Sequence, residues 1–256
     1  MSRWLGNISQ IVVNPDGSTT ATYVNYDENG NPESGSNVTT DLSGNVSTQD
    51  VEYDSSGNPE VTGYTIDTGG NTSGTGMTVA DAVDTGFIAF DGKSFSCTGE
   101  VEFATQDQGT SPYKTFISAL ELISENKYKG FYIRNTNLYT IGMFASNEGL
   151  TLTSTGTGGF GVGSTVQIVK ARTRYTFTLN YTPGTTSGNI SFTITPTGSN
   201  SGANVNTNGV GTISGQSSSL PPTMQNAKIM LGGNPILNTC EWANLTVYSF
   251  NVHKTN

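Results

Sequence analysis

The sequence predicts an all-β protein, and three observations support this prediction. Hydrophobic residues make up 33% and charged residues 12% of the 256 positions, below the usual values of about 45–50% and about 25%. Apolar and polar residues alternate with a period of two in many short segments, as in strands with one covered face. Gly, Asn, Asp and Ser separate these segments at short intervals, as expected for strands joined by turns.

The N-terminal part is organised by a repeated pentapeptide, Asp-x-x-Gly-Asn. It occurs four times, beginning at Asp27, Asp41, Asp54 and Asp67, with steps of 14, 13 and 13 residues. Asp at the start of a turn and Gly three residues later is the preference of a type I turn, in which Gly is free to adopt a positive φ. Each unit is therefore predicted to be a short strand that enters a turn.

Each predicted unit carries only about two apolar side chains. That is too few to offset the cost of ordering the backbone, about 1–2 kcal/mol per residue, so the units must stack or share an apolar face with other copies of the chain. We favour the second route, a fibre shaft that closes as a homotrimer, because three apolar strips form a prism without an open sheet edge. The predicted oligomer interface consists of Trp4, Val24, Tyr26, Val38, Val51, Tyr53, Tyr64 and Ile66.

The sequence divides into three predicted parts: an attachment segment over 1–20, the repeat shaft over 21–76 and a β-sandwich over 82–256. Ile11 and Val13 precede the turn Asn14–Gly17, so the first segment is either a degenerate fifth repeat or a peg anchored by Trp4. The Gly/Ser/Thr-rich stretch 71–77 is predicted to be a hinge.

The third part contains many alternating segments, which predict a two-sheet sandwich. A clear example is Tyr175–Tyr181, where aromatic and apolar residues alternate with Thr and Asn. Lys114–Glu125 has a helical option, but its β-branched residues favour a strand. The predicted strands are Gly86–Phe90, Lys93–Thr105, Phe116–Ile123, Gly130–Arg134, Tyr139–Ala145, Gly149–Ser154, Thr165–Val169, Arg174–Tyr181, Asn189–Thr195, Lys228–Gly232 and Leu245–Val252.

Two family resemblances accompany these patterns. Tyr26–Asn31 and Tyr53–Asn58 resemble the Tyr-Asp repeats of bacterial surface and toxin-delivery proteins, although Asn stands where those repeats carry Arg or Leu after the Gly. The ordered series Asp84–Phe90, Glu100–Phe103, Lys129–Arg134, Tyr175–Tyr181, Ile190–Ile194, Ile229–Gly233, Trp242–Leu245 and Val247–Val252 resembles a concanavalin A-like (laminin G-like) jelly roll. The second resemblance covers about two thirds of the chain and implies a domain of a kind found in phage and bacterial surface proteins, whose members bind glycans or proteins.

Catalytic and metal-binding patterns are sparse, and we predict neither an enzyme nor a cofactor or metal. Glu100 and Glu102 share a strand face at a spacing of roughly 6.6–6.8 Å, which two-carboxylate glycan hydrolysis would accept, but the related glucanase strand Glu-x-Asp-x-Glu has a third acid that is absent here. The single histidine, His253, stands near the C-terminus. The two cysteines, Cys97 and Cys240, form no CxxC pair, which excludes a typical zinc site and leaves open two buried thiols or a disulfide.

Binding residues are harder to assign from the sequence. Tyr113, Tyr128, Tyr132 and Tyr139 could line a glycan site, or they could be half-buried strand residues. The formal charge of −9 disfavours nucleic-acid binding through a basic patch, and no segment has the roughly 20 apolar residues of a membrane span.

These observations predict a bacteriophage virion structural protein, a head or tail fibre subunit made in the host cytoplasm and displayed on the virion surface. Its N-terminus would contact other virion proteins, and its jelly roll would attach to a bacterial surface glycan or protein. The first segment has no apolar run of signal-peptide length, which favours this hypothesis. The alternatives are a bacterial cell-surface or secreted carbohydrate-binding protein with a monomeric spacer and, third, a glycan hydrolase.

Overall fold

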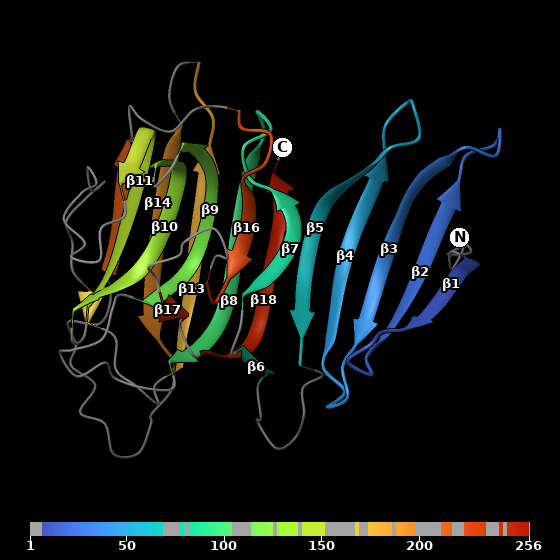
Figure 1. Ribbon diagram of the computed structural model, residues 1–256, viewed down its shortest axis with the longest axis horizontal. Helices are drawn as coiled ribbons and strands as arrows, with labels where there is room; N and C mark the ends of the chain where they lie inside the picture. Colours follow the sequence, from blue (N-terminus) through green and yellow to red (C-terminus); the bar gives the residue numbers. More distant parts are fainter. Residues whose placement is uncertain are drawn as a thin grey trace.

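The chain forms two β-sheets that pack face to face, as the computed structural model in Figure 1 shows. The structure describes residues 7–68, 77–79, 82–103, 114–124, 127–137, 140–151, 167–168, 174–185, 188–197, 211–216, 223–233, 241–242 and 245–255. Within these residues the larger sheet has eleven strands and the smaller sheet seven. The predicted all-β class and the two-sheet sandwich are confirmed.

The larger sheet has the order β1 (Asn7–Val13), β2 (Thr19–Tyr26), β3 (Pro32–Thr40), β4 (Val46–Tyr53), β5 (Pro59–Asp67), β18 (Leu245–Thr255), β8 (Ser94–Phe103), β13 (Arg174–Thr182), β14 (Asn189–Pro196) and β15 (Gly211–Gln216), with β6 (Met77–Val79) paired to β18. The smaller sheet has the order β12 (Gln167–Ile168), β11 (Thr140–Thr151), β10 (Lys127–Asn137), β9 (Lys114–Ser124), β16 (Lys228–Leu231) and β7 (Val83–Ile88), with β17 (Glu241–Trp242) paired to β9.

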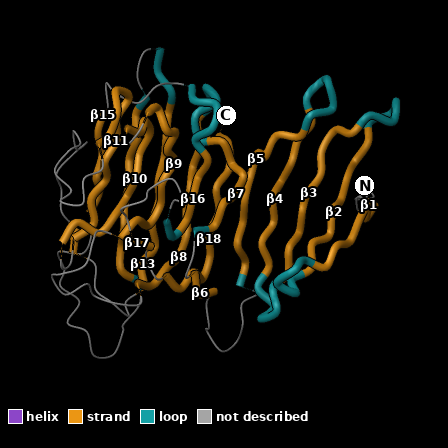
Figure 2. The backbone as a smooth tube through the Cα atoms, in the orientation of Figure 1, coloured by secondary structure: helices purple, strands orange, loops and turns teal. Residues whose placement is uncertain are grey.

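The repeats form an antiparallel meander, β1–β5, which continues the larger sheet of the sandwich. Tyr64 and Ile66 of β5 stand opposite Val252 and Phe250 of β18, and their side chains belong to the sandwich core, with 6% and 1% exposure. Figure 2 shows the meander extending beyond the smaller sheet. A single chain therefore pairs these strands with one another and with the sandwich, and it does not show a shaft; the homotrimer stays a prediction.

Where the meander meets the smaller sheet, β4 and β5 lie next to β7. The Gln49 amide Nε2 donates a hydrogen bond of 3.0 Å to the carbonyl oxygen of Thr85, and Val61 packs against the core. Of the two alternatives for residues 1–20, the pairing of β1 with β2 favours a degenerate repeat, since Ile11 and Val13 lie in a strand ahead of a turn. Trp4 lies outside the described residues.

The structure divides the predicted apolar strip between the two faces of the meander. Val24 and Val51 lie in one cross-strand row through Gly35, whereas Val38 stands opposite Ala21 and Thr48 on the other face. The reason is a β-bulge in the β2–β3 pair beside Tyr26, because one extra residue in a strand reverses the alternation that follows it. The predicted strip was based on the distance of each residue from the next Asp in the sequence, and that distance does not reveal the reversal.

The first three copies of the repeated pentapeptide form turns of the meander as predicted, and the fourth, Asp67–Asn71, extends beyond the described residues. In the first turn the Gly30 N–H donates to the Asp27 carbonyl oxygen at 3.0 Å, and Gly30 has φ 83°. The Asn31 backbone N–H and side-chain Nδ2 donate to Asp27 Oδ1 and Oδ2 at 2.8 and 3.0 Å, and the same contacts recur at Asp41 and Asp54. The final Asn of the motif therefore binds both oxygens of the carboxylate that opens the turn.

We expect Asn58→Ala to raise the pKa of Asp54 toward its ordinary value. The Asn58 side chain and backbone hold the pKa of the Asp54 carboxyl below that value. A carboxyl whose pKa is lowered by folding adds stability above its unfolded pKa of about 3.9, and this contribution is lost as the pH falls through the folded value. A carboxyl ¹³C NMR titration measures the shift; Asp27, whose pKa is lowered by Asn31, is the unchanged internal control. An unaltered Asp54 titration would contradict this account.

The sandwich core lies between β8, β13, β14 and β18 of the larger sheet and β7, β9, β10 and β16 of the smaller one. The predicted alternation of β13 is confirmed, with Tyr175, Phe177, Leu179 and Tyr181 buried and Thr176 and Asn180 exposed. Lys114–Glu125 contains the predicted strand, β9. The predicted segments Tyr139–Ala145 and Gly149–Ser154 contribute residues 140–145 and 149–151 to one strand, β11; Tyr139 and residues 152–154 lie outside the described residues. Strands β6, β15 and β17 were not predicted.

Candidate functional site

A polar groove crosses the face of the larger sheet that points away from the smaller sheet. We call this feature the outer groove. Its volume is about 500 Å³, and it runs over β5, β18, β8 and β13. Its polar lining residues are Thr65, Asp67, Thr98, Glu100, Thr176, Thr178, Ser249 and Asn251, and Ile66, Gly99, Phe177 and Phe250 complete the lining.

The strand register places these polar residues in two cross-strand rows. Asp67, Ser249, Glu100 and Thr176 form one row, and Thr65, Asn251, Thr98 and Thr178 form the other. Neighbouring strands lie about 4.8 Å apart, so hydroxyl, amide and carboxylate groups recur at that spacing across the sheet. Every second residue of each strand points into the core instead, which is why apolar residues such as Phe177 and Phe250 separate the polar ones in sequence.

Gly99 allows close packing directly beneath the groove. A Cβ at this position would lie 2.6 Å from the Ser249 carbonyl oxygen and 2.7 Å from the Phe177 ring. Phe177 and Phe250 are the two ladder partners of Gly99, and their ring centroids lie 6.3 Å apart. A larger residue would push the rings or the Ser249 strand away, so Gly99 helps to set the shape of the groove floor.

A charged cluster lies at one end of the groove. The Tyr248 hydroxyl donates to Glu102 Oε2 at 3.2 Å, and the Arg174 guanidinium carbon lies 3.5 Å from the centroid of the Tyr248 ring, a cation–π arrangement. Burial and the negative charge of Glu102 raise the pKa of the Tyr248 hydroxyl. The ring is therefore neutral at ordinary pH, and its two neighbours hold it in place.

The two candidate catalytic carboxylates have separate hydrogen-bond partners. Glu100 Oε1 accepts a hydrogen bond of 3.0 Å from the Thr197 hydroxyl, whereas Glu102 accepts one from Tyr248. His253 is exposed, and its Nδ1 lies 3.1 Å from Asn251 Oδ1, next to the groove. The arrangement offers hydrogen-bond acceptors and donors to a polar ligand.

The described tyrosines and the described cysteine that were singled out from the sequence are not among the lining residues of the outer groove. Tyr128 and Tyr132 are buried, with 4% and 3% exposure. Both are strand residues whose side chains are covered by the rest of this chain. Cys97 is a buried free thiol, and burial raises the pKa of that thiol. Tyr113, Tyr139 and Cys240 lie outside the described residues.

Neither a metal-ligand cluster nor a membrane-spanning helix is found among the described residues. Within this part of the chain no group of three or more His, Cys, Asp and Glu side chains is placed to hold a metal ion. The same part contains no helix with the length and apolar character needed to cross a membrane.

Sequence reasoning missed the outer groove because its residues come from four distant segments. Thr and Ser are common in this chain, so each groove residue is unremarkable by itself. The alternation of β13 did indicate that Thr176 and Thr178 face away from the core. What the sequence did not reveal was that Asp67 and Glu100 would be brought into one row by the pairing of β18 with both β5 and β8.

Comparison with known proteins found similarity among solved structures but not among protein families or curated proteins. No protein-family model matches the chain, and no curated protein matches it. Among solved structures, it is similar to a seed lectin (isoform) of Lotus tetragonolobus, with 12% sequence identity and a TM-score of 0.31, over 96% of this chain and 90% of the lectin. A likeness with so low a TM-score carries no argument about the fold family or about a ligand.

Proposed function

We propose that the outer groove binds a glycan, and that the chain is a bacteriophage virion structural protein, a head or tail fibre subunit, that displays this groove toward a bacterial surface. The observation that carries glycan binding is the two-row arrangement of eight polar side chains across four strands. Sugar hydroxyls both donate and accept hydrogen bonds, so carboxylates, amides and hydroxyls at regular spacing are suitable partners.

The charge of the groove narrows the class of glycan. Asp67 and Glu100 are the two ionisable side chains among its lining residues, and the chain carries a formal charge of −9. Carboxylates repel an acidic polysaccharide and accept hydrogen bonds from neutral hydroxyls. The preferred ligand is therefore a neutral polysaccharide, and the groove acts by binding rather than by hydrolysis.

Display on a virion is supported by the composition and by the turn-rich meander. A Gly/Ser/Thr/Asn-rich β-structure with little charge suits an exposed surface that functions outside a cell. One observation favours a second candidate, a bacterial cell-surface or secreted lectin: the meander strands are paired within a single chain, as a monomeric spacer would require.

The binding proposal predicts that Glu100→Gln and Asn251→Ala each weaken glycan binding by tenfold or more. Each change removes a polar partner from the groove, and a tenfold loss corresponds to about 1.4 kcal/mol. The measurement is titration calorimetry of the full chain with neutral bacterial polysaccharides first identified on a glycan array. Matched controls are Glu52→Gln and Asn25→Ala, which alter exposed residues of the meander and should leave affinity unchanged.

The same variants, measured by calorimetry and by an assay for glycan cleavage, distinguish glycan binding at the outer groove from the absence of such binding and from hydrolysis. If the wild-type chain binds no glycan, or if the groove variants bind as tightly as the controls, glycan binding at the outer groove is wrong. Release of new reducing ends by the wild-type chain, abolished in Glu100→Gln and Glu102→Gln but not in Glu52→Gln, would indicate a hydrolase instead.

A further inference from the structure

The open edge of the larger sheet is β1, which pairs with β2 and with no other strand among the described residues. The Asn14 N–H donates to the Ser18 carbonyl oxygen at 2.8 Å. Because N–H groups alternate in direction along an antiparallel strand, the N–H of Val12 also points toward β2, and those of Ile11 and Val13 point away from it. The edge therefore presents unpaired backbone donors and acceptors to any strand of suitable shape.

This edge lacks two usual features that prevent strand addition, charged residues and Pro, and its β-bulge lies between Ile8 and Gln10, before the stretch Ile11–Val13. Natural edge strands often carry Lys or another charged residue, or a Pro. Strand β1 contains no charged residue and no Pro. In the whole hairpin 7–26 the single charged residue is Asp16, in the turn. The acidic residues of the meander strands lie further in, on β3–β5: Glu33, Asp50, Glu52, Glu60 and Asp67.

Apolar side chains accompany the open backbone edge. Ile8, Ile11 and Val13 are 54%, 60% and 72% exposed, which is unusual for three aliphatic residues of one strand. The register continues this apolar character inward, since Ile11 stands opposite Ala21 and Ala21 opposite Val38. The outermost strand thus combines hydrogen-bonding capacity with an apolar strip on one face.

We propose that β1 pairs antiparallel with β1 of a second copy of this chain, joining two larger sheets into one across a two-fold axis. The charge distribution argues for a second copy at this edge: two chains of formal charge −9 repel each other, and the repulsion is smallest where the meeting strands carry no charge, as β1 does. A two-fold antiparallel pairing is self-complementary, and it places Ile11 and Val13 of one copy beside the apolar residues of the other. Such cross-strand pairs contribute to sheet stability.

The pairing has a consequence that rests on the proposed function. The outer groove lies on β5, β18, β8 and β13, at the far side of the meander from β1. A two-fold seam at β1 would give each assembly two grooves separated by two meanders, which suits avid attachment to a repeating surface polymer.

The test is the mass of the full chain in solution, measured by light scattering and sedimentation over a concentration series. We expect two copies of the 26.9 kDa chain, and at least tenfold weaker association for Ile11→Pro, which removes an outward N–H without removing a hydrogen bond to β2. Ile11→Lys is the second variant; it keeps the backbone and adds a charge to the seam. Ile123→Lys, which alters a 48% exposed isoleucine of β9 in the smaller sheet, is the matched control and should leave the dimer intact.

Each other result overturns the proposal. A chain that remains single at all concentrations contradicts it, as does the trimer predicted from the sequence. A dimer that persists equally in Ile11→Pro and Ile11→Lys, with both variants folded by circular dichroism, would place the interface elsewhere. None of these outcomes depends on glycan binding, so failure of this proposal is distinguishable from failure of the proposed function.

Discussion

Phe90→Ala is expected to lower the free energy of unfolding by about 3–5 kcal/mol, the range for large aromatic residues removed from a packed core. Phe90 is 0% exposed. Its ring contacts three other aromatic rings edge to face, with centroid distances of 6.3 Å to Phe95, 6.0 Å to Phe131 and 4.8 Å to Tyr181. Aromatic pairs of this geometry contribute about 0.5–1.5 kcal/mol beyond the area that they bury.

The position of Phe90 explains why the loss should be large. Phe95 and Tyr181 belong to β8 and β13 of the larger sheet, and Phe131 belongs to β10 of the smaller sheet. One side chain therefore packs against both layers of the sandwich. Alanine would leave a cavity between the sheets, and rigid strands on both sides cannot collapse to fill it.

Denaturant unfolding of the wild type and variant measures this effect, with Tyr26→Ala as the control. Tyr26 is an aromatic residue that is 57% exposed, so its truncation should change the free energy of unfolding by about 0.5 kcal/mol or less. Phe90→Leu should show an intermediate loss because it fills part of the cavity. A loss below about 1 kcal/mol for Phe90→Ala would mean that the two sheets do not share this aromatic contact.

Local chemistry made part of this fold predictable from the sequence. The turn Asp27–Asn31 depends on a carboxylate, a glycine and an amide within five residues, so the motif itself contains the physical cause. The alternation of Tyr175, Phe177 and Leu179 likewise predicts a strand with one buried face without knowledge of its neighbours.

Long-range pairing was not predictable in the same way. Nothing near Tyr64 in the sequence indicates that it will stand opposite Val252, because a backbone edge can accept any strand with a compatible pattern. The assumption that the repeats needed sister chains overlooked this option: β18 supplies the missing neighbour for β5. The outer groove follows from the same pairing, so the candidate site was hidden as long as the strand order was unknown.

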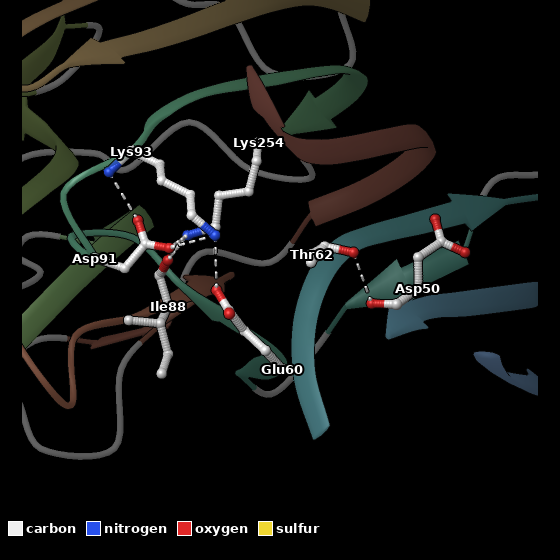
Figure 3. A network of polar contacts seen from close by, with 7 residues as sticks. All are labelled: Asp50, Glu60, Thr62, Ile88, Asp91, Lys93 and Lys254. Atoms are coloured by element: carbon white, nitrogen blue, oxygen red, sulfur yellow. Dashed lines mark hydrogen bonds and ion pairs between the residues drawn. The ribbon is translucent and has the colours of Figure 1, made fainter. Parts of the chain in front are cut away.

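Lys254→Met is expected to lower the free energy of unfolding by about 2–4 kcal/mol, since removal of one partner leaves a partly buried charge unpaired. Lys254 Nζ lies 2.7 Å from Asp91 Oδ2, donates to the Ile88 carbonyl oxygen at 2.6 Å, and lies 4.4 Å from the Phe87 ring centroid. Figure 3 shows the pair with Lys93 and Glu60. The side chains of Lys254 and Asp91 are only 11% and 19% exposed.

This ion pair connects the last strand of the chain to the segment between β7 and β8. Burial raises the pKa of Asp91, but the hydrogen bond and charge of Lys254 outweigh burial, and the net pKa is lowered. Asp91 therefore contributes stability above its unfolded pKa of about 3.9, and this contribution is lost as the pH falls through the folded value.

In Lys254→Met the sign of this pH dependence should reverse. Without Lys254, burial would raise the folded pKa of Asp91 above the unfolded value, so its charged form would destabilise the variant and protonation would relieve it. The difference in unfolding free energy between wild type and variant should consequently shrink between about pH 7 and about pH 4. The measurement is denaturant unfolding at both pH values.

A double-variant cycle provides the control for Lys254→Met. In the Asp91→Asn background the same Lys254→Met change should cost less than in the wild type, because no carboxylate is left unpaired, and the difference between the two costs measures the coupling. Equal costs in both backgrounds, or a loss independent of pH, would mean that Lys254 stabilises the fold through its contacts with Ile88 and Phe87 and not through its charge. Lys93, 3.9 Å from Asp91 and 54% exposed, is too solvated to replace Lys254 fully, so the coupling should remain measurable.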